Sequence, residues 1–205
     1  MLEKIGTPGF ETLSAADETV CENVERLVAD GQGHPVVAEI GIGIGATTRE
    51  LARILDDGGE LHLYDFHAKL ADVMGDLEGL GYDHVVAFGN TTKYWDSYNW
   101  SLMKQVQAHD TPIYDYIYLD GAHTFHHDAL AFVLCDRLLK PGGHIDFDDY
   151  FWSLSRSKWM ADTRHDYLTE EQIDAQQVKV VIETLVRTDP RYEEVVANKV
   201  FRKLA

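Results

Sequence analysis

The sequence predicts an α/β fold in which helices cover both faces of a doubly wound, mostly parallel sheet. Two observations carry this prediction: short apolar segments alternate with helical segments along most of the 205 residues, and most apolar segments end in a glycine or an acidic residue. Such alternation builds parallel sheets, because each crossover helix returns the chain to start the next strand in the same direction. The composition, 45% hydrophobic and 26% charged, is that of a globular protein. We therefore expect a single domain over residues 1–205.

Apolar periodicity and glycines predict the elements of the first half. In the first helix Val20, Val24 and Leu27 share one face, and Ser14 is a suitable N-terminal cap. The first strand is continuously apolar and runs directly into a glycine-rich loop, and glycines also follow the next two helices. The predicted order is helix 14–29, strand 36–40, helix 48–55, strand 60–64, helix 68–80 and strand 85–88. Residues 1–30 thus form a helical segment ahead of the sheet.

The second half repeats the alternation and ends in a pair of strands. A turn, Lys140-Pro141-Gly142-Gly143, closes its central helix, and Asn198-Lys199 is a hairpin-sized connection between the last two strands. The predicted order is helix 94–108, strand 114–119, helix 126–139, strand 144–147, helix 170–186, and strands 192–197 and 200–204.

The charge balance excludes some classes of partner. The chain carries 18 Lys and Arg against 35 Asp and Glu, a formal net charge of −17. Binding to duplex nucleic acid or to an anionic membrane surface needs a basic patch, so we expect neither partner. No apolar stretch approaches the ~20 residues of a membrane span, and the N-terminus lacks a secretory pattern, so we expect a cytoplasmic protein. Cys21 and Cys135 fit no metal or redox spacing and are expected to be free thiols.

The candidate functional residues lie where the predicted strands end. Parallel sheets bind ligands at the carboxyl ends of their strands. Acidic residues dominate these positions, which is difficult to explain by packing alone. The strand-end residues are Glu39, Asp65, Gly89, Asn90, Asp120, Asp148 and Asp149.

A glycine loop follows the first predicted strand and opens a helix. Gly41, Gly43 and Gly45 allow a tight turn and a close approach of a ligand to the backbone. With Ala46 the loop also fits the dinucleotide-binding fingerprint, and Asp65 lies at the spacing of a ribose-binding acid. This motif alone does not separate a nicotinamide cofactor from an adenosyl one.

The ordered combination of motifs is more specific. Glu39 before the glycine loop, the Lys140–Gly143 turn and the terminal strand pair together resemble the class I S-adenosylmethionine-dependent methyltransferases, over about residues 14–205. The resemblance implies a seven-stranded sheet with an antiparallel last strand. It also implies S-adenosylmethionine as the cofactor.

The resemblance assigns cofactor contacts to matching positions. The loop with Gly41, Gly43 and Gly45 would face the methionine part, and Glu39 would reach its amino group. Asp65 would accept hydrogen bonds from the ribose hydroxyls, and Asn90 would lie near the adenine. Asp120 would border the cofactor from the next strand.

A second group of acids suggests a metal. Adjacent strand ends place Asp120 near Asp148 and Asp149, and three close carboxylates repel one another unless a cation or protons intervene. Such oxygen ligands suit Mg²⁺, with Mn²⁺ or Ca²⁺ also acceptable. The alternative is that Asp120 caps a turn and the Asp pair is only solvated.

This group resembles the metal site of the small metal-dependent O-methyltransferases of the catechol, caffeoyl-CoA and macrolide-sugar types. Asp120, Asp148 and Asp149 match the metal-binding positions of that group. Where the catechol type has a lysine base this chain has His123, and where the macrolide-sugar type has an aspartate it has Ala122. Histidine titrates near neutral pH, so His123 is the candidate general base, assisted by Asp120.

Several alternatives remain open from the residues alone. His123 could be an inert loop residue, or it could bind zinc with His126 and His127, although a third ligand with clear spacing is lacking. Asp146 lies inside a strand that should be buried, where an unpaired carboxylate is costly.

A basic, aromatic segment over 150–168 follows the Asp pair and is a candidate lid or substrate loop. It contains Phe151, Trp152 and Trp159 among Arg156 and Lys158.

These features predict a methyltransferase that uses S-adenosylmethionine and a divalent metal, Mg²⁺ first, to methylate a hydroxyl of a small molecule. The rivals are an NAD-dependent oxidoreductase, a methyltransferase-like binding protein without transferase activity, and an N-methyltransferase. A homodimer is left open.

Overall fold

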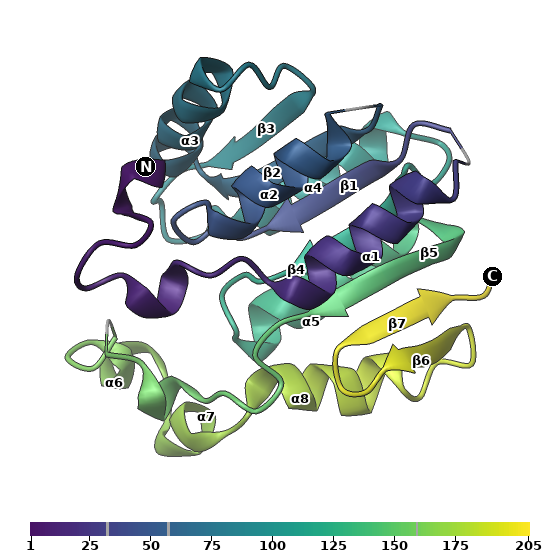
Figure 1. Ribbon diagram of the computed structural model, residues 1–205. Helices are drawn as coiled ribbons and strands as arrows, with labels where there is room; N and C mark the ends of the chain where they lie inside the picture. Colours follow the sequence, from purple (N-terminus) through teal and green to yellow (C-terminus); the bar gives the residue numbers. More distant parts are fainter. Residues whose placement is uncertain (32, 57, 159) are drawn as a thin grey trace.

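The computed structural model describes residues 1–31, 33–56, 58–158 and 160–205 (Figure 1). Seven strands form one sheet in the order β3-β2-β1-β4-β5-β7-β6, and β7 runs antiparallel to both of its neighbours. The predicted doubly wound sheet with an antiparallel last strand is confirmed. The strands are β1 Val36–Ile40, β2 Glu60–Phe66, β3 Val85–Asn90, β4 Tyr114–Leu119, β5 Leu139–Phe147, β6 Tyr192–Val196 and β7 Val200–Lys203.

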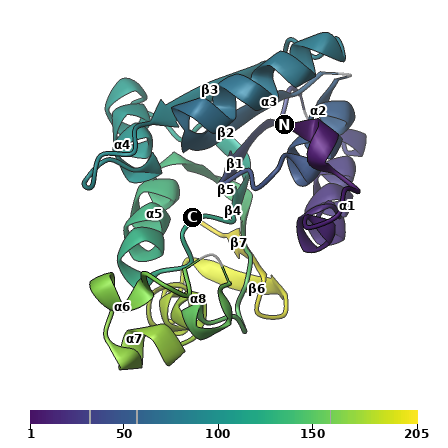
Figure 2. The same cartoon turned by 90° about the vertical axis from the view of Figure 1, so that its left-hand side faces the viewer.

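Helices cover both faces of the sheet. Helices α1, α2 and α3 lie on one face, and α4, α5 and α8 lie on the other (Figure 2). The α-helices are α1 Glu18–Ala29, α2 Ala46–Leu55, α3 His67–Gly79, α4 Tyr98–Ala108, α5 Phe125–Leu138, α6 Arg164–Tyr167, α7 Glu170–Asp174 and α8 Gln177–Val181. Short 3₁₀ turns span Leu2–Lys4, Glu11–Leu13 and Leu154–Arg156, and a π-helical turn spans Ile182–Val186. No helix in these described ranges combines the length and apolar character needed to cross a membrane.

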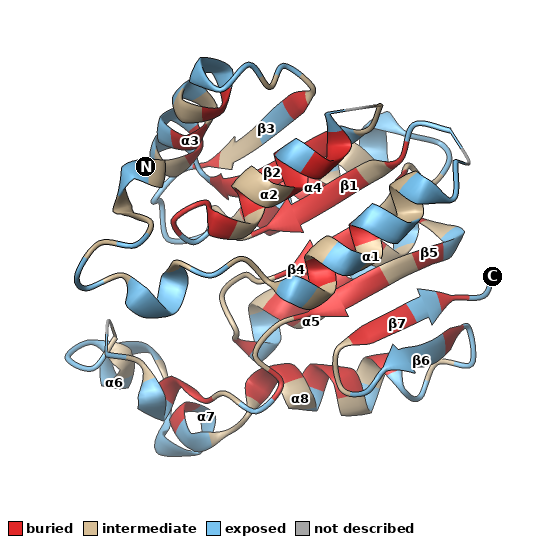
Figure 3. Ribbon diagram, viewed as in Figure 1, coloured by how far each residue is buried: buried red, intermediate tan, exposed pale blue. Residues whose placement is uncertain are grey.

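Each face of the sheet has its own hydrophobic cluster, because successive strand residues point to opposite sides. In β1, Val37 packs with α1, α2 and α3, whereas Ala38 packs with α4, α5 and α8. Tyr116 and Ile117 of β4 divide in the same way. The central strands are accordingly buried along nearly their whole length (Figure 3).

Three local expectations were wrong. Helix α1 begins later than predicted because Asp17, and not Ser14, is its cap, and the Asp17 side chain accepts a hydrogen bond from the Val20 amide at 2.9 Å. The predicted helix over 170–186 is interrupted where Ala175 adopts an extended conformation. The residues expected to form a turn at 140–143 lie within β5, which contains a register irregularity there.

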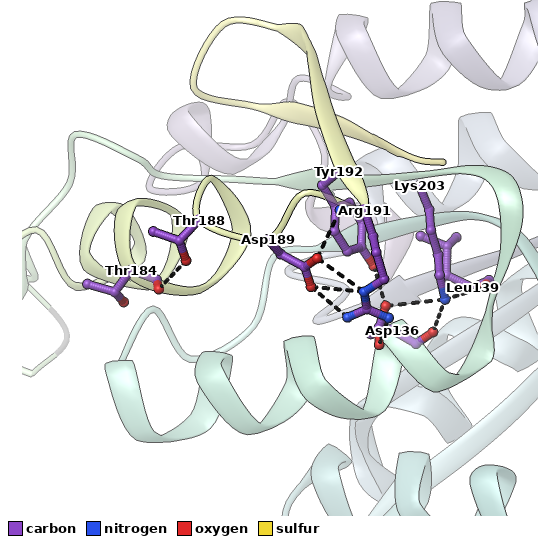
Figure 4. A network of polar contacts seen from close by, with 8 residues as sticks. All are labelled: Asp136, Leu139, Thr184, Thr188, Asp189, Arg191, Tyr192 and Lys203. Atoms are coloured by element: carbon purple, nitrogen blue, oxygen red, sulfur yellow. Dashed lines mark hydrogen bonds and ion pairs between the residues drawn. The ribbon is translucent and has the colours of Figure 1, made fainter. Parts of the chain in front are cut away.

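Polar contacts anchor the terminal hairpin of β6 and β7 to α5 and the start of β5 (Figure 4). The hydroxyl of Tyr192 donates to the Asp136 carboxylate at 2.9 Å, and Arg191 pairs with Asp136 and Asp189 at 3.0 and 2.6 Å. Lys203 donates to the carbonyl of Leu139 at 3.1 Å. The hairpin is therefore fixed beside β5, which matters for the site described below.

The glycine loop after β1 is held tightly against the end of β4. Gly41 has a φ of +87°, and a Cβ at this position would lie 1.9 Å from the carbonyl oxygen of Asp120. Gly45 has a φ of +89° and packs under the Leu2 side chain. Both positions therefore require glycine for conformation and for space.

We expect Gly41→Ala to lower the free energy of unfolding by at least about 2 kcal/mol, because the added methyl both clashes with backbone and strains φ. Gly75→Ala is the matched control, since no heavy atom lies within 4 Å of its added Cβ in exposed helix α3. Alanine there should stabilise by about 0.5–1 kcal/mol. Urea denaturation of both variants checks this, and equal stability of the two would contradict the assigned loop geometry.

Candidate functional site

Strand register brings the predicted strand-end residues to one edge of the sheet. Ile40 is level with Leu119, and Leu119 is level with Phe147. The amide of Asp120 donates to the Ile40 carbonyl at 2.9 Å, and the amide of Asp148 donates to the Leu119 carbonyl at 3.1 Å. The glycine loop and the acids after β4 and β5 therefore meet at the same edge.

A first cavity of about 470 Å³ opens at this edge beside the glycine loop. It is lined by most of the residues predicted to bind a cofactor, together with Tyr98 and with Lys69, which sequence reasoning missed. The predicted residues that line it are Gly41, Gly43, Asp65, Asn90 and Asp120. Two residues that were predicted to bind the cofactor do not line this cavity. Gly45 packs behind the loop, and Glu39 lies buried in β1.

Asp65 fixes the wall of the first cavity. Its carboxylate accepts hydrogen bonds from the amide of Ile42 at 3.1 Å and of Phe66 at 2.6 Å, and it pairs with Lys69 at 3.0 Å. Asn90, at the end of β3, is also buried and donates to the Thr91 carbonyl at 3.2 Å. The Asp65 carboxylate thus ties the glycine loop to β2 and α3.

Glu39 is a buried carboxylate beneath the glycine loop. Only 1% of it is exposed, and its Oε2 has no hydrogen-bond partner among the described residues. Burial raises the pKa of Glu39 to about 8, since the charged form loses its hydration. Glu39 does not line the first cavity, so its unpaired oxygen lies in the interior of the fold behind the loop.

A second cavity, of about 520 Å³, lies on the other side of the glycine loop. Residues 12, 13 and 15–19 of the N-terminal segment line it, with Asp17 and Glu18 among them, and so do Asp148 and Asp149 after β5. The segment over 150–168 was the sequence's candidate lid, but its described residues line neither of the two cavities. Trp159 lies outside the described residues. Both segments lie along the edge at which the parallel strands end (Figures 1 and 2).

The two cavities share part of their lining. Leu13, Gly43, Asp120 and His123 border both. A group held in the first cavity and a group held in the second would therefore meet beside the Asp120 carboxylate and the His123 imidazole.

His123 is held in an unusual conformation between acids. Its Nε2 lies 3.4 Å from Asp120 and 3.7 Å from Asp149, and its ring meets the edge of Trp152 with centroids 5.3 Å apart. His123 and Asp149 have φ values of +51° and +61°, which residues other than glycine rarely adopt. Backbone strain of this kind persists only where the surrounding structure fixes the residue in place. Such residues are common at functional sites.

Burial sets the protonation of these groups. It lowers the pKa of His123, although Asp149 and Asp148 oppose this effect. Burial raises the pKa of Asp120 well above its usual range, and repulsion from Asp148 adds to this. Burial also raises the pKa of Asp149. The imidazole is thereby kept neutral and able to accept a proton.

The structure does not show the predicted metal sites. Among the described residues, no three His, Cys, Asp or Glu side chains are arranged to hold a metal ion. The acids proposed as ligands have nitrogen atoms of this chain beside them: His123 faces Asp120 and Asp149, and Lys199 lies 3.9 Å from Asp148. An ammonium repels a divalent cation and cannot ligate it, so the surroundings of Asp148 do not fit the predicted metal. The zinc alternative with His126 and His127 gains no support from the described residues.

Lys199 is the main residue of this edge that sequence reasoning missed. It follows Asn198 in the hairpin turn, which was recognised only as a connection. Its ammonium pairs with Asp146 at 3.0 Å, and Asp146 also accepts a hydrogen bond from the Tyr116 hydroxyl at 2.6 Å. This pairing explains how a carboxylate is tolerated inside β5. The available signal was the charge of Asp146 itself, which demanded a partner of opposite sign.

Comparison with known proteins identifies the family of the chain. A family model described as "Methyltransferase domain" matches residues 38–150, more than half of the chain. A search of curated proteins found no match.

Solved structures with the same arrangement include three methyltransferases. An O-methyltransferase from Bacillus cereus in complex with SAH has 20% identity and a TM-score of 0.60, covering 100% of this chain and 90% of that one. The SAH-bound Podospora anserina methyltransferase PaMTH1 has 16% identity and a TM-score of 0.65, covering 100% and 86%. The O-methyltransferase TomG from Streptomyces achromogenes, in complex with SAM, has 15% identity and a TM-score of 0.60, covering 93% and 82%. At these identities the likeness shows a shared fold.

We expect the stability difference between the wild type and Glu39→Gln to depend on pH. Because the pKa is raised to about 8 in the folded state from 4.5, the wild type binds this proton more tightly when folded. The stability that the Glu39 proton contributes to the wild type is fully present below pH 4.5. It decreases as the pH rises to about 8 and is constant above that. The loss relative to Glu39→Gln is at most about 1.4 kcal/mol per pH unit over this window.

Chemical denaturation at pH 5 and pH 8 measures this difference. Glu78→Gln, at an exposed position on α3, is the control and should follow the wild type at both pH values. Parallel pH profiles for the wild type and Glu39→Gln would contradict the raised pKa.

Proposed function

Because the chain belongs to the methyltransferase domain family, we propose that it transfers a methyl group from S-adenosylmethionine to a hydroxyl oxygen of a small molecule. The family assignment confirms the resemblance seen in the sequence at the level of a methyltransferase of this fold. The acceptor class and the roles of individual residues are part of the proposal. The observation that carries it is the junction of the two cavities at Asp120 and His123.

The first cavity suits the cofactor. The Gly41 and Gly43 backbone provides close approach, and the unpaired Oε2 of Glu39 lies beneath the same loop and needs a hydrogen-bond donor, such as an amino group. Asp65 holds the loop through the Ile42 amide and retains acceptor capacity on the cavity side. Asn90 closes the far end. S-adenosylmethionine would supply a methyl group on a positively charged sulfur.

His123 is assigned as the general base for the acceptor in the second cavity. As the bond from the acceptor oxygen to the methyl carbon forms and the sulfur–methyl bond breaks, the hydroxyl proton passes to the neutral imidazole. Asp149 lies beside the ring, and its negative charge stabilises the imidazolium that results. Much of the remaining task is positioning, because the methyl donor is already activated.

The acceptor is expected to enter from the side of the N-terminal segment. Asp17 and Glu18 border the second cavity, whereas Trp152 acts on it only through its contact with His123. The proposal places the enzyme in the cytoplasm with a small hydroxylated acceptor.

Isothermal titration should detect binding of S-adenosylhomocysteine and no binding of NAD⁺. Asp65→Asn should weaken the S-adenosylhomocysteine affinity by about tenfold or more, because the loop amide and Lys69 lose a charged acceptor. Asp110→Asn, at an exposed position between α4 and β4, is the control and should bind as the wild type does. Binding of NAD⁺ instead would favour the oxidoreductase alternative.

His123→Asn should lower kcat by about 10²–10⁴, because the proton acceptor is removed. The affinity for S-adenosylhomocysteine should change less than about threefold, since the imidazole acts on the acceptor. Methyl transfer from labelled S-adenosylmethionine to a panel of catechols, phenols and sugars provides the assay. His126→Asn changes an exposed neighbour and should keep the wild-type rate. Equal rates for both variants would remove His123 from the mechanism.

A further inference from the structure

Lys199 brings a positive charge to the edge of the second cavity. Its Nζ lies 2.9 Å from Asp17, 3.0 Å from Asp146 and 3.9 Å from Asp148. It also lies 5.3 Å from the centroid of the Tyr118 ring, which lines the cavity. One ammonium thus joins the cap of α1, the interior of β5 and the acid pair that follows β5.

The fold fixes this lysine in place. The amide of Phe147 donates to the Lys199 carbonyl at 2.9 Å, and Val200 is level with Asp146 in the antiparallel pairing of β5 and β7. The opposite end of the hairpin is anchored by the contacts of Tyr192, Arg191 and Lys203 (Figure 4). Lys199 is only 19% exposed, so its position does not depend on a mobile surface side chain.

The charge of the ammonium is retained in this environment. Burial alone would lower the pKa of Lys199, but the attraction of Asp146 and Asp17 outweighs it and raises the pKa to about 12. The side chain therefore remains a cation throughout the physiological range.

Each acid predicted as a metal ligand is already approached by a nitrogen of the chain. His123 Nε2 lies within 3.7 Å of Asp120 and Asp149, and Lys199 faces Asp148. Carboxylates in one small volume need a compensating cation or protons. Lys199 supplies such a cation beside Asp148, whereas the neutral imidazole of His123 supplies none until it accepts a proton.

We propose that Lys199 takes the place of a divalent cation at this edge, so that the chain orients its acceptor cavity without a metal. Lys199 is a positioning residue: it holds Asp17 and Asp148, which line the cavity, and it does not touch the reacting atoms. The reaction itself rests on the function proposed above, but the substitution of an ammonium for a metal is tested by metal binding alone.

The test is a titration with Mn²⁺, followed by electron paramagnetic resonance, on the full chain with S-adenosylhomocysteine present. The wild type and Asp148→Asn should bind Mn²⁺ equally weakly, with a Kd above about 1 mM. Lys199→Gln should bind Mn²⁺ about tenfold or more tightly than the wild type, because Asp17 and Asp148, which line the cavity, lose their cation and become available to the metal.

Lys140→Gln is the matched control. It removes an ion pair of 2.8 Å with Asp115 on another part of the sheet, and it should leave Mn²⁺ binding at the wild-type level. Lys199→Arg keeps the positive charge and should also leave the Mn²⁺ affinity at the wild-type level.

Two results would overturn the proposal. One is wild-type binding of Mn²⁺ below about 0.1 mM that is lost in Asp148→Asn, which would establish a metal site formed by these acids. The other is a folded Lys199→Gln with unchanged Mn²⁺ affinity. Should Lys199→Gln fail to fold, as judged by circular dichroism, the comparison of the wild type with Asp148→Asn decides alone.

Failure of the proposed function is recognised separately. Calorimetry on the same samples measures S-adenosylhomocysteine binding, and an absence of heat there would count against the methyltransferase site. The Mn²⁺ affinities would still decide the role of Lys199.

Discussion

The compensation of negative charge at the strand ends is the constraint on which this site depends. Parallel strands necessarily finish at one edge, and here β1, β2, β4 and β5 all finish in acids or beside them. The terminal hairpin supplies this compensation by bringing Lys199 to Asp146 and Asp148. The loop after β4 places the neutral imidazole of His123 beside Asp120 and so adds no charge. An antiparallel last strand is therefore more than a way to close the sheet edge, since it determines which cation reaches the site.

The order of elements and the ligand edge were predictable because they follow from local signals. Apolar runs give strands, glycine at Gly41 gives the loop, and parallel strands share one carboxyl edge whatever their neighbours are. The same reasoning located Asp65, Asn90 and Asp120, which line the first cavity. Such positions follow directly from where each strand ends.

What sequence reasoning missed depends on contacts between distant segments. Lys199 lies 182 residues from Asp17, and no local pattern links the two. The cap of α1 was assigned to Ser14, whereas Asp17 caps the helix through the Val20 amide and also pairs with the distant Lys199. The segment over 150–168 was the candidate lid because it follows the acid pair in sequence, whereas the second cavity is lined by the N-terminal residues 12, 13 and 15–19.

A histidine at position 123 follows from the same charge compensation. A lysine there would add a second permanent cation beside Lys199, and an aspartate would add a further acid to a group that already repels itself. A buried, neutral imidazole avoids both, because it carries no charge until it accepts a proton and then pairs with Asp149. The positive φ values of His123 and Asp149 bring these two side chains together at a conformational cost. The positive charge thus develops beside these acids only as the proton arrives.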